Sequence, residues 1–320
     1  MRILTTLISA MCLMTTMLYA AEREVVIPCD WGNIGATLAD TEAGSDTAVL
    51  VVAGSGPTDR NGNSGLNLNT YCYKMLADGL VNEGFAVLRY DKRAVGASYL
   101  PAEEIPHLLF DDYVEDAARC VAWLREAGYG KVIIAGHSEG GSIALEVVSR
   151  GLADVDGVVL LCAPGYAMDR ILMTQLSAQL VPSHMGLMVQ AERIIRSLKG
   201  GELVAAERVP KELISLFHPM VQPFLISSMA CDPCAAIARC SKPVLIITGG
   251  RDIQVSVDNG EALLAASTTA RHTSFESMCH TLKDAANSDR VEQLVSVYTN
   301  PTLPLTEGLV AEITEFINNL

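Results

Sequence analysis

Positive charge and aromatic side chains are both scarce in this sequence. Its 320 residues include 23 Lys and Arg against 37 Asp and Glu, for a net charge of −14, and only 5% of the residues are aromatic. No block of Lys and Arg is long enough to neutralise a run of phosphates, so nucleic acid and anionic lipid are excluded as expected partners. The sequence also lacks internal repeats and low-complexity linkers.

Apolar residues, by contrast, are abundant. They make up 50% of the chain, charged residues make up 19%, and the mean hydropathy is +0.28. Such a chain is too apolar for a disordered protein, and its length fits one large α/β domain or two small ones. We expect no later segment of membrane-spanning length without charges, and hence no membrane insertion once the N-terminal segment is removed.

The first twenty residues have the features of a secretory signal peptide. Arg2 gives a short positive region, residues 3–18 carry no charge, and the small residue Ala20 precedes the next charged residues. The uncharged stretch is shorter than the roughly 20 residues that span a bilayer, which disfavours the alternative of an uncleaved anchor. The sequence therefore predicts a signal peptide over residues 1–20 and a secreted or periplasmic protein.

Eight cysteines follow this leader, and an even number in an exported chain is compatible with disulfides. Their spacing assigns no pairs, and several lie in apolar patterns typical of buried free thiols, so both states stay open. Cys231, Cys234 and Cys240 begin with the spacing of a zinc knuckle, but no fourth ligand is evident, and we expect no metal. The eight are Cys29, Cys72, Cys120, Cys162, Cys231, Cys234, Cys240 and Cys279.

Strand-like apolar runs alternate with segments of helical spacing. After a hairpin-like opening pair near residues 25–40, strands are expected at 47–53, 85–90, 131–135, 158–162, 244–248 and 271–275. Helices are expected at 71–81, 113–127, 142–149 and 309–317. Near-continuous apolar strands separated by helices predict a mostly parallel eight-stranded sheet with helices on both faces.

One stretch interrupts this alternation. Residues 165–240 show no strand pattern, and helical spacing and many methionines, as at 171–180 and 185–198, predict a helical cap or lid over the strand ends. Residues 21–164 and 241–320 then form the α/β core.

The sequence around Ser138 matches G-x-S-x-G directly after the strand at 131–135 and before a helix. Gly136 and Gly140 let the strand and the helix approach closely, while Ser138 occupies a strained turn. The helix N-terminus favours a developing oxyanion there. An incidental serine in a glycine-rich turn is the alternative, which this position disfavours, so Ser138 is the predicted nucleophile.

The base should follow the nucleophile and the acid in the chain. His280 lies on the loop beyond the last strand-like run, where such a base belongs. The other histidines are disfavoured. His107 and His137 come too early in the chain, His184 and His218 lie in the predicted cap, and His272 lies within a strand-like run.

The acid should lie on the turn after the strand at 244–248. Asp252 is placed there and can accept a hydrogen bond from the His280 ring, which would fix its tautomer. Asp258 and Asp284 are the alternatives, one near the next helix start and the other downstream of His280.

Two backbone N–H groups are needed for an oxyanion hole. One belongs to Glu139, the residue after the nucleophile, and the other to Ser55, on the loop after the strand at 47–53. Gly54 and Gly56 flank Ser55 and leave its backbone free to turn.

These motifs together resemble the α/β-hydrolase superfamily, and within it the bacterial esterase D-like carboxylesterases and S33-type serine hydrolases. Residues 54–63 match a G-S-G-P-x-D-R-D-G-N loop with Asn61 in place of Asp, and residues 89–98 match R-Y-D-K-R-G-x-G-x-S with Ala94 in place of Gly. Residues 249–255 match G-x-x-D-x-Q-V, and 279–283 match N-H-x-L-K with Cys279 in place of Asn. The resemblance implies the α/β-hydrolase fold and covers roughly residues 24–320.

The expected activity is hydrolysis of small carboxylic esters, with short to medium acyl groups, through an acyl-enzyme and without a cofactor. An aminopeptidase or amidase with the same triad remains an alternative, because acids of the insertion offer a site for a substrate ammonium: Glu192, Glu202, Glu207 and Glu212. A non-catalytic binding protein is a further alternative. The charges of Arg60, Asp91, Lys92 and Arg93 are expected to form a buried network that braces the oxyanion loop, and the oligomeric state stays open.

Overall fold

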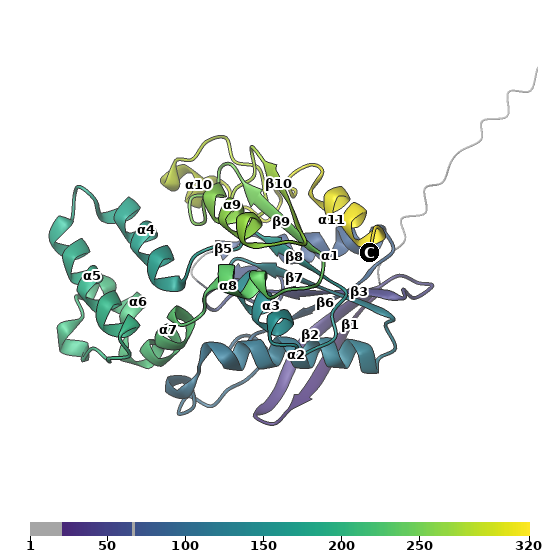
Figure 1. The fold of residues 1–320 in the computed structure, drawn as a ribbon, viewed down its shortest axis with the longest axis horizontal. Coiled ribbons are helices and arrows are strands. Elements are labelled where there is room, and N and C mark those ends of the chain that lie inside the picture. Colours follow the sequence, from purple (N-terminus) through teal and green to yellow (C-terminus); the bar gives the residue numbers. More distant parts are fainter. Residues whose placement is uncertain (1–20, 66–67) are drawn as a thin grey trace, which may run out of the picture.

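The computed structural model describes residues 21–65 and 68–320, so the predicted signal peptide over 1–20 lies outside the described residues. In the described part, eight strands form one sheet in the order β1-β2-β6-β3-β7-β8-β9-β10 (Figure 1). The strands are β1 (Ala21–Cys29), β2 (Gly32–Asp40), β3 (Thr47–Val52), β6 (Ala86–Tyr90), β7 (Lys131–His137), β8 (Gly157–Leu161), β9 (Val244–Gly249) and β10 (Ala270–Phe275).

The sheet is parallel from β6 to β10, and the β1–β2 hairpin adds an antiparallel edge. Central strands such as β8 and β9 are buried at every position, which explains their unbroken apolar sequence. The expected α/β-hydrolase fold with its eight-stranded, mostly parallel sheet is confirmed. A separate short pair, β4 (Asn63–Ser64) and β5 (Leu68–Asn69), lies outside the main sheet.

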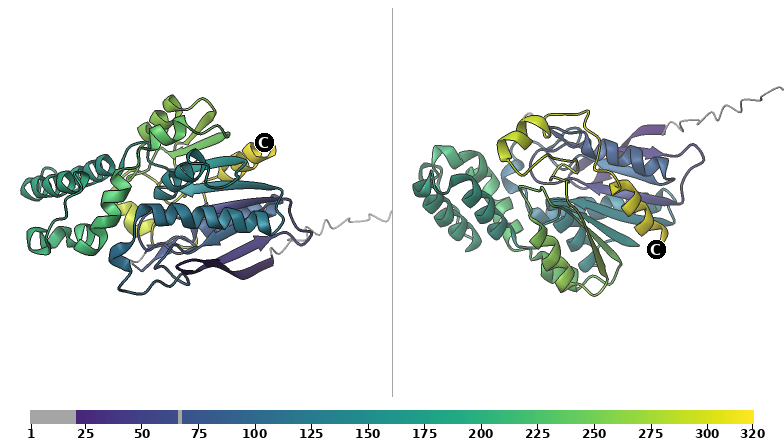
Figure 2. Two further views of the ribbon diagram at one scale, coloured as in Figure 1. Left: turned by 60° about the horizontal axis from the view of Figure 1, so that its bottom comes forward. Right: turned by 90° about the horizontal axis from the view of Figure 1, so that it is seen from above.

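Helices cover both faces of the sheet (Figure 2). Helices α1 (Cys72–Asn82) and α11 (Leu309–Asn318) pack on one face. Helices α2 (Phe110–Glu126), α3 (Glu139–Ser149), α8 (Pro233–Ala238) and α9 (Val257–Ala266) contribute to the apolar core on the other. Each presents an apolar stripe; in α2 this stripe includes the buried Val114, Val121 and Leu124.

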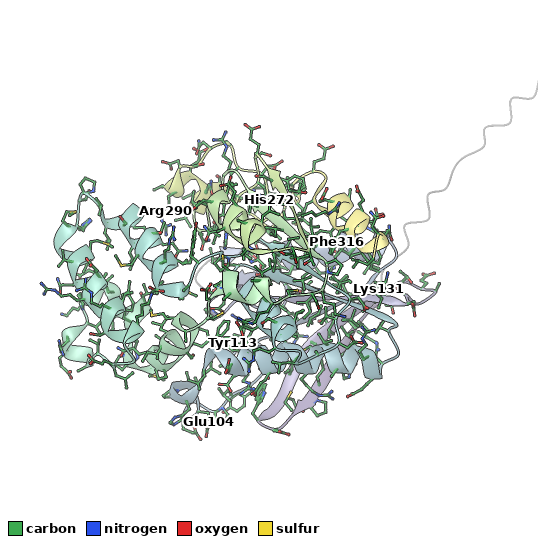
Figure 3. All side chains as sticks on the ribbon, in the orientation of Figure 1. Glu104, Tyr113, Lys131, His272, Arg290 and Phe316 are labelled. Atoms are coloured by element: carbon green, nitrogen blue, oxygen red, sulfur yellow. The ribbon has the colours of Figure 1, made fainter. Side chains whose placement is uncertain are left out.

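Four helices extend beyond one end of the sheet as a group, α4 (Met168–Leu180), α5 (Met185–Lys199), α6 (Ile214–Phe217) and α7 (Gln222–Met229) (Figures 1 and 2). They lie within the expected cap of residues 165–240, whereas α8, at the end of that range, packs on the sheet with α3. Helices α4 and α5 coincide with the expected segments. The group has an apolar core of its own, which includes Ile195, Leu198 and Phe217. Tyr113 of α2, labelled in Figure 3, lies at the junction between these helices and the sheet. Phe224 of α7 packs against it, with ring centroids 5.3 Å apart.

The expectation that no later segment has membrane-spanning length without charges is wrong for part of these helices. Residues 213–231 contain no Asp, Glu, Lys or Arg, and Lys211–Ala238 is long and apolar enough to cross a membrane by length and composition alone. In the structure this stretch is divided into short helices, with Pro219, Pro223 and Pro233 in their first turns. Of the most apolar 18 consecutive residues in this stretch, 33% are buried.

All eight cysteines of the described residues are free thiols. Cys231 Sγ lies 3.4 Å from the Glu146 carboxylate, whereas Cys234 Sγ lies 3.0 Å from the Gly165 carbonyl oxygen. The two thiols thus interact with separate groups rather than sharing a common one.

Candidate active site

Ser138 occupies the sharp turn between β7 and α3. Its backbone angles, φ 53° and ψ −123°, are rarely adopted by a non-glycine residue, which is the strain expected of a nucleophile elbow. A Cβ on Gly136 would lie 2.2 Å from the Gly140 carbonyl oxygen, and one on Gly140 would lie 2.2 Å from the Val52 carbonyl oxygen. Both positions therefore require glycine for the strand and helix to approach.

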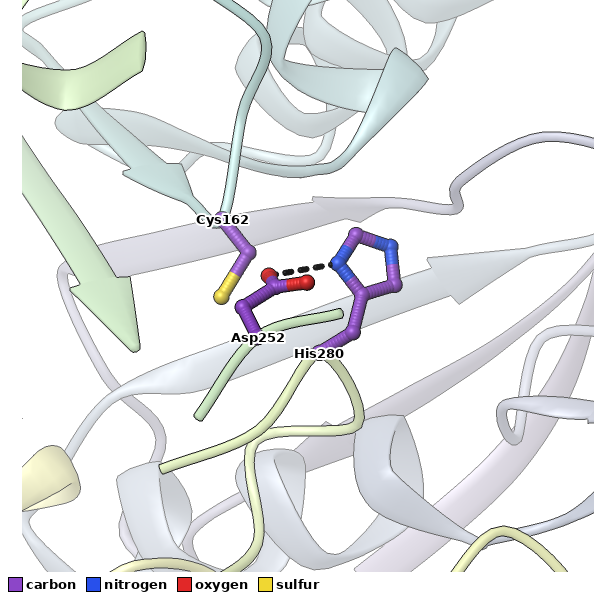
Figure 4. Close-up of side chains that lie close together, drawn as sticks. All are labelled: Cys162, Asp252 and His280. Atoms are coloured by element: carbon purple, nitrogen blue, oxygen red, sulfur yellow. Dashed lines mark hydrogen bonds and ion pairs between the residues drawn. The ribbon is translucent and has the colours of Figure 1, made fainter. Parts of the chain in front are cut away.

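The structure brings Asp252 and His280 together, from the turn after β9 and the loop after β10 (Figure 4). His280 Nδ1 lies 2.7 Å from Asp252 Oδ2, and both side chains are buried. The other carboxylate oxygen, Oδ1, accepts the backbone N–H groups of Gln254 and Val255 at 2.7 and 2.9 Å. The carboxylate is thereby held in one orientation, with Oδ2 facing the imidazole.

The alternative residues have other environments. Asp258 is exposed on α9, and Asp284 is exposed and accepts hydrogen bonds from Ser277 and Thr306. His272 interacts through Nε2 with the Thr248 hydroxyl. The geometry therefore favours Asp252 and His280 as the acid and base.

The side chain of Cys162, the residue after β8, lies beside this pair (Figure 4). Its sulfur, an Asp252 oxygen and a His280 nitrogen lie within 4.8 Å of one another, a grouping that resembles a set of metal ligands. Burial, reinforced by the Asp252 charge, raises the pKa of the Cys162 thiol well above its usual value. His280 Nδ1 is already engaged by the Asp252 carboxylate at 2.7 Å, which is the arrangement of an acid–base pair.

Ser138 and His280 line one cavity of about 430 Å³ between the sheet domain and the helices of residues 165–240. The described residues show no hydrogen bond between these two side chains. Such catalytic contacts are often long before substrate binds and tighten in the reactive complex. The structure thus brings the predicted nucleophile and base to the same cavity wall.

Ser55 and Glu139 also line this cavity. Within the described residues neither backbone N–H donates a hydrogen bond, so both can serve an oxyanion. The close approach of the Ser55 loop requires glycine at position 54, because a Cβ there would lie 3.0 Å from Ser138 Cβ and 3.2 Å from His137 Nδ1.

A buried ion pair lies beneath the Ser55 loop. Lys92 Nζ donates to the Gly54 carbonyl oxygen at 2.6 Å and to Glu139 Oε1 at 3.1 Å. Glu139 Oε2 in turn accepts the Ser55 hydroxyl at 3.2 Å. The Lys92 and Glu139 side chains are only 1% and 3% exposed, so this pair is screened little by solvent.

The charges of Arg60, Asp91, Lys92 and Arg93 are buried as expected, but they form separate ion pairs rather than one network, and the partners of Lys92 and Arg93 were not expected. Arg60 pairs with Asp91 at 2.9 Å, and Arg93 pairs with Asp116 at 2.8 Å. The partner of Lys92 is Glu139, 47 residues away, so no local pattern could have indicated it. Glu139 therefore contributes a side chain that braces the loop, in addition to the backbone N–H predicted for the oxyanion hole.

His137 is buried between the predicted catalytic residues and stays neutral. Burial, followed by the neighbouring His280, lowers the pKa of His137 from 6.5 to about 3. Its nitrogens are both engaged, Nδ1 with Tyr73 and Nε2 with the His280 carbonyl oxygen. His137 is therefore not available as a base, in agreement with its exclusion by chain order.

This lowered pKa predicts a loss of stability in acid. Below pH 6.5 the unfolded state takes up a proton on His137, whereas the folded state does so only near pH 3. We expect the free energy of unfolding to fall between these values, and to fall less steeply in a His137→Gln variant. Urea unfolding of both proteins across this pH window measures the difference; parallel curves would contradict the assignment.

The sheet order, the strained turn at Ser138 and the Asp252–His280 pair together define an α/β-hydrolase. The chain belongs to the family described as serine aminopeptidase, S33, whose sequence profile matches residues 63–283. The resemblance drawn from the motifs is thereby confirmed.

Known proteins of this kind include both esterases and peptidases. The chain is 30% identical over 227 residues to Esterase EstD of Thermotoga maritima; the match covers 69% of this chain and 50% of EstD, so the chain spans about half that relative's length. An esterase from Pyrococcus furiosus has a similar structure (TM-score 0.58, 17% identity, 94% of this chain and 92% of that one). So does proline iminopeptidase from Mycobacterium smegmatis (TM-score 0.56, 13% identity, 93% and 98%). The fold alone therefore does not choose between ester and amide.

Proposed function

We propose that this protein is a serine esterase that hydrolyses small carboxylic esters. Ser138 Oγ attacks the ester carbonyl while His280 Nε2 takes its proton, and the Ser55 and Glu139 N–H groups hold the oxyanion. His280 then protonates the leaving alcohol, and water, activated by the same base, releases the acid from the acyl-enzyme. Asp252 orients His280 and stabilises its charged form. The mechanism needs no cofactor.

The carboxylates of the cavity wall are the observation that favours an ester over an aminopeptidase substrate. Among the described residues that line it, Glu139 is the only carboxylate, and its oxygens are engaged by Lys92 and Ser55. An aminopeptidase needs a free acid to hold the substrate ammonium. The acids of the insertion that were candidates for this role, Glu192, Glu202, Glu207 and Glu212, do not line the cavity.

The size and lining of the cavity support short to medium acyl groups. A volume of about 430 Å³ lies near the lower end of the roughly 300–1,000 Å³ common for small-molecule sites. The part of the wall supplied by the helices of residues 165–240 is mainly aliphatic, with one aromatic ring: Met168, Ile171, Leu172, Leu216, Met220, Val221, Phe224 and Leu225. We propose that these helices form the cap that sets acyl specificity.

The test is turnover of p-nitrophenyl esters from acetate to decanoate, beside aminoacyl anilides. We expect ester turnover with an optimum at short or medium chains. Leu216→Trp should move the optimum to shorter chains by filling the cavity, whereas Leu203→Trp, at a 64% exposed cap position, should leave it unchanged. Faster turnover of the anilides would reject the esterase and favour the aminopeptidase.

We further propose that the enzyme is secreted or periplasmic and is not inserted in a membrane after removal of the leader. The support for export is the charge and hydropathy pattern of residues 1–20. Division of the apolar 211–238 stretch into short helices supports the absence of a later span.

A further inference from the structure

A chain of buried hydrogen bonds runs beneath the proposed catalytic residues. The Gly54 N–H donates to the Tyr73 hydroxyl oxygen at 3.0 Å, and that hydroxyl lies 2.8 Å from His137 Nδ1. His137 Nε2 lies 2.7 Å from the backbone carbonyl oxygen of His280. The Tyr73 and His137 rings pack against each other with centroids 5.5 Å apart, and the His137 ring packs against that of His280 at 4.7 Å.

The donor and acceptor properties of these groups fix the direction of every hydrogen bond in this chain. A carbonyl oxygen can only accept, so His137 Nε2 must carry the hydrogen that it donates to His280. In a neutral imidazole Nδ1 is then the acceptor, and the Tyr73 hydroxyl must donate to it. The Tyr73 oxygen remains free to accept the Gly54 N–H, so all three hydrogen bonds are satisfied at once.

The chain joins segments that are far apart in the sequence. Gly54 follows β3 and precedes the oxyanion residue Ser55; Tyr73 lies in α1. His137 ends β7 and precedes the nucleophile Ser138, while His280 lies 143 residues further on, in the loop after β10. Each end of the chain is thus at, or one residue from, a group proposed to take part in the reaction.

We infer that Tyr73 and His137 are positioning residues. They hold the Ser55 loop, the turn at Ser138 and the loop that carries His280 in fixed positions relative to one another. The inference rests on the proposed function. Neither side chain moves a proton in the reaction. Their hydrogen bonds fix the backbone at Gly54 and His280, and a displacement of about 1 Å at reacting groups can cost about a hundredfold in rate.

The test is Tyr73→Phe, which removes only the hydroxyl that links Gly54 to His137. We expect kcat for the preferred ester to fall about tenfold to a hundredfold, with KM changed less than about threefold, because the cavity keeps its shape. The matched control is Tyr90→Phe, since Tyr90 is also fully buried but its hydroxyl has no partner among the described residues. This control should keep the kcat of the wild type.

A second readout does not depend on knowing the substrate. Diisopropyl fluorophosphate reacts when a serine oxygen attacks phosphorus and fluoride leaves, with the serine proton passing to the base. Its rate with Ser138 should fall in Tyr73→Phe by a factor similar to that in kcat. If the wild type is phosphorylated at Ser138 but hydrolyses no ester, the esterase proposal fails while this readout still decides the role of Tyr73.

The conservative variant at His137 separates positioning from core packing. His137→Gln keeps a donor and an acceptor on one side chain and should retain more kcat than His137→Leu, which keeps neither. An unchanged kcat in Tyr73→Phe overturns the inference. So does an equal loss in Tyr73→Phe and Tyr90→Phe, or equal activity of the Gln and Leu variants at position 137.

Discussion

Replacement of Ser138 by Ala is expected to lower kcat for the preferred ester by about 10⁵-fold or more. The variant loses the proposed nucleophile, and loss of a nucleophile from an intact triad has effects of about this size. The strained turn at φ 53° is retained by a residue of similar volume, so folding should survive. Steady-state kinetics and thermal unfolding of the two proteins measure both expectations.

Ser149→Ala is the matched control, because Ser149 ends the same helix, α3, and its hydroxyl has no partner among the described residues. It should leave kcat unchanged. Ester hydrolysis that persists at the wild-type rate in Ser138→Ala would reject the mechanism and favour a different nucleophile.

Asp252→Asn is expected to lower kcat by about 10⁴-fold with little change in KM. The N–H groups of Gln254 and Val255 would hold the amide oxygen, so the amide nitrogen would face His280. It would donate to Nδ1 and force the ring hydrogen onto Nε2, where the base must accept the Ser138 proton. The rate should therefore fall while the cavity and the binding of substrate stay the same.

Asp258→Asn and Asp284→Asn serve as controls, since both carboxylates are exposed and neither contacts His280. Both variants should keep the wild-type kcat. A larger loss in either control than in Asp252→Asn would assign the acid to that position instead.

Most of the fold could be predicted from the sequence, because the patterns that define its strands and its glycine-dependent turn are local. Strands buried on both faces have unbroken apolar sequences. The strand expected at residues 244–248 is β9, whose bounds differ by one residue. Gly136 and Gly140 could be recognised since no other residue fits beside the neighbouring backbone. Helix α2 begins at Phe110, before the expected residue 113, because residues 110–112 add a first turn with two acids at its N-terminus.

The proposed site was only partly accessible from the sequence. Asp252 and His280 follow strands whose order the fold dictates, so their meeting could be expected. The partners of Lys92 and Tyr73 lie 47 and 64 residues away, at positions that only the folded backbone brings together. The uncharged run at residues 213–231 could not be recognised from apolar periodicity, because Pro219, Pro223 and several polar residues interrupt it.

The central claim is that Ser138 becomes covalently acylated. The most direct measurement is mass spectrometry of the protein stopped during turnover of a p-nitrophenyl ester, followed by peptide mapping. The account predicts a mass increase equal to the acyl group on the peptide that contains Ser138, and none in Ser138→Ala. An acyl adduct on another residue, or rapid ester turnover with no adduct on Ser138 at any time, would contradict it.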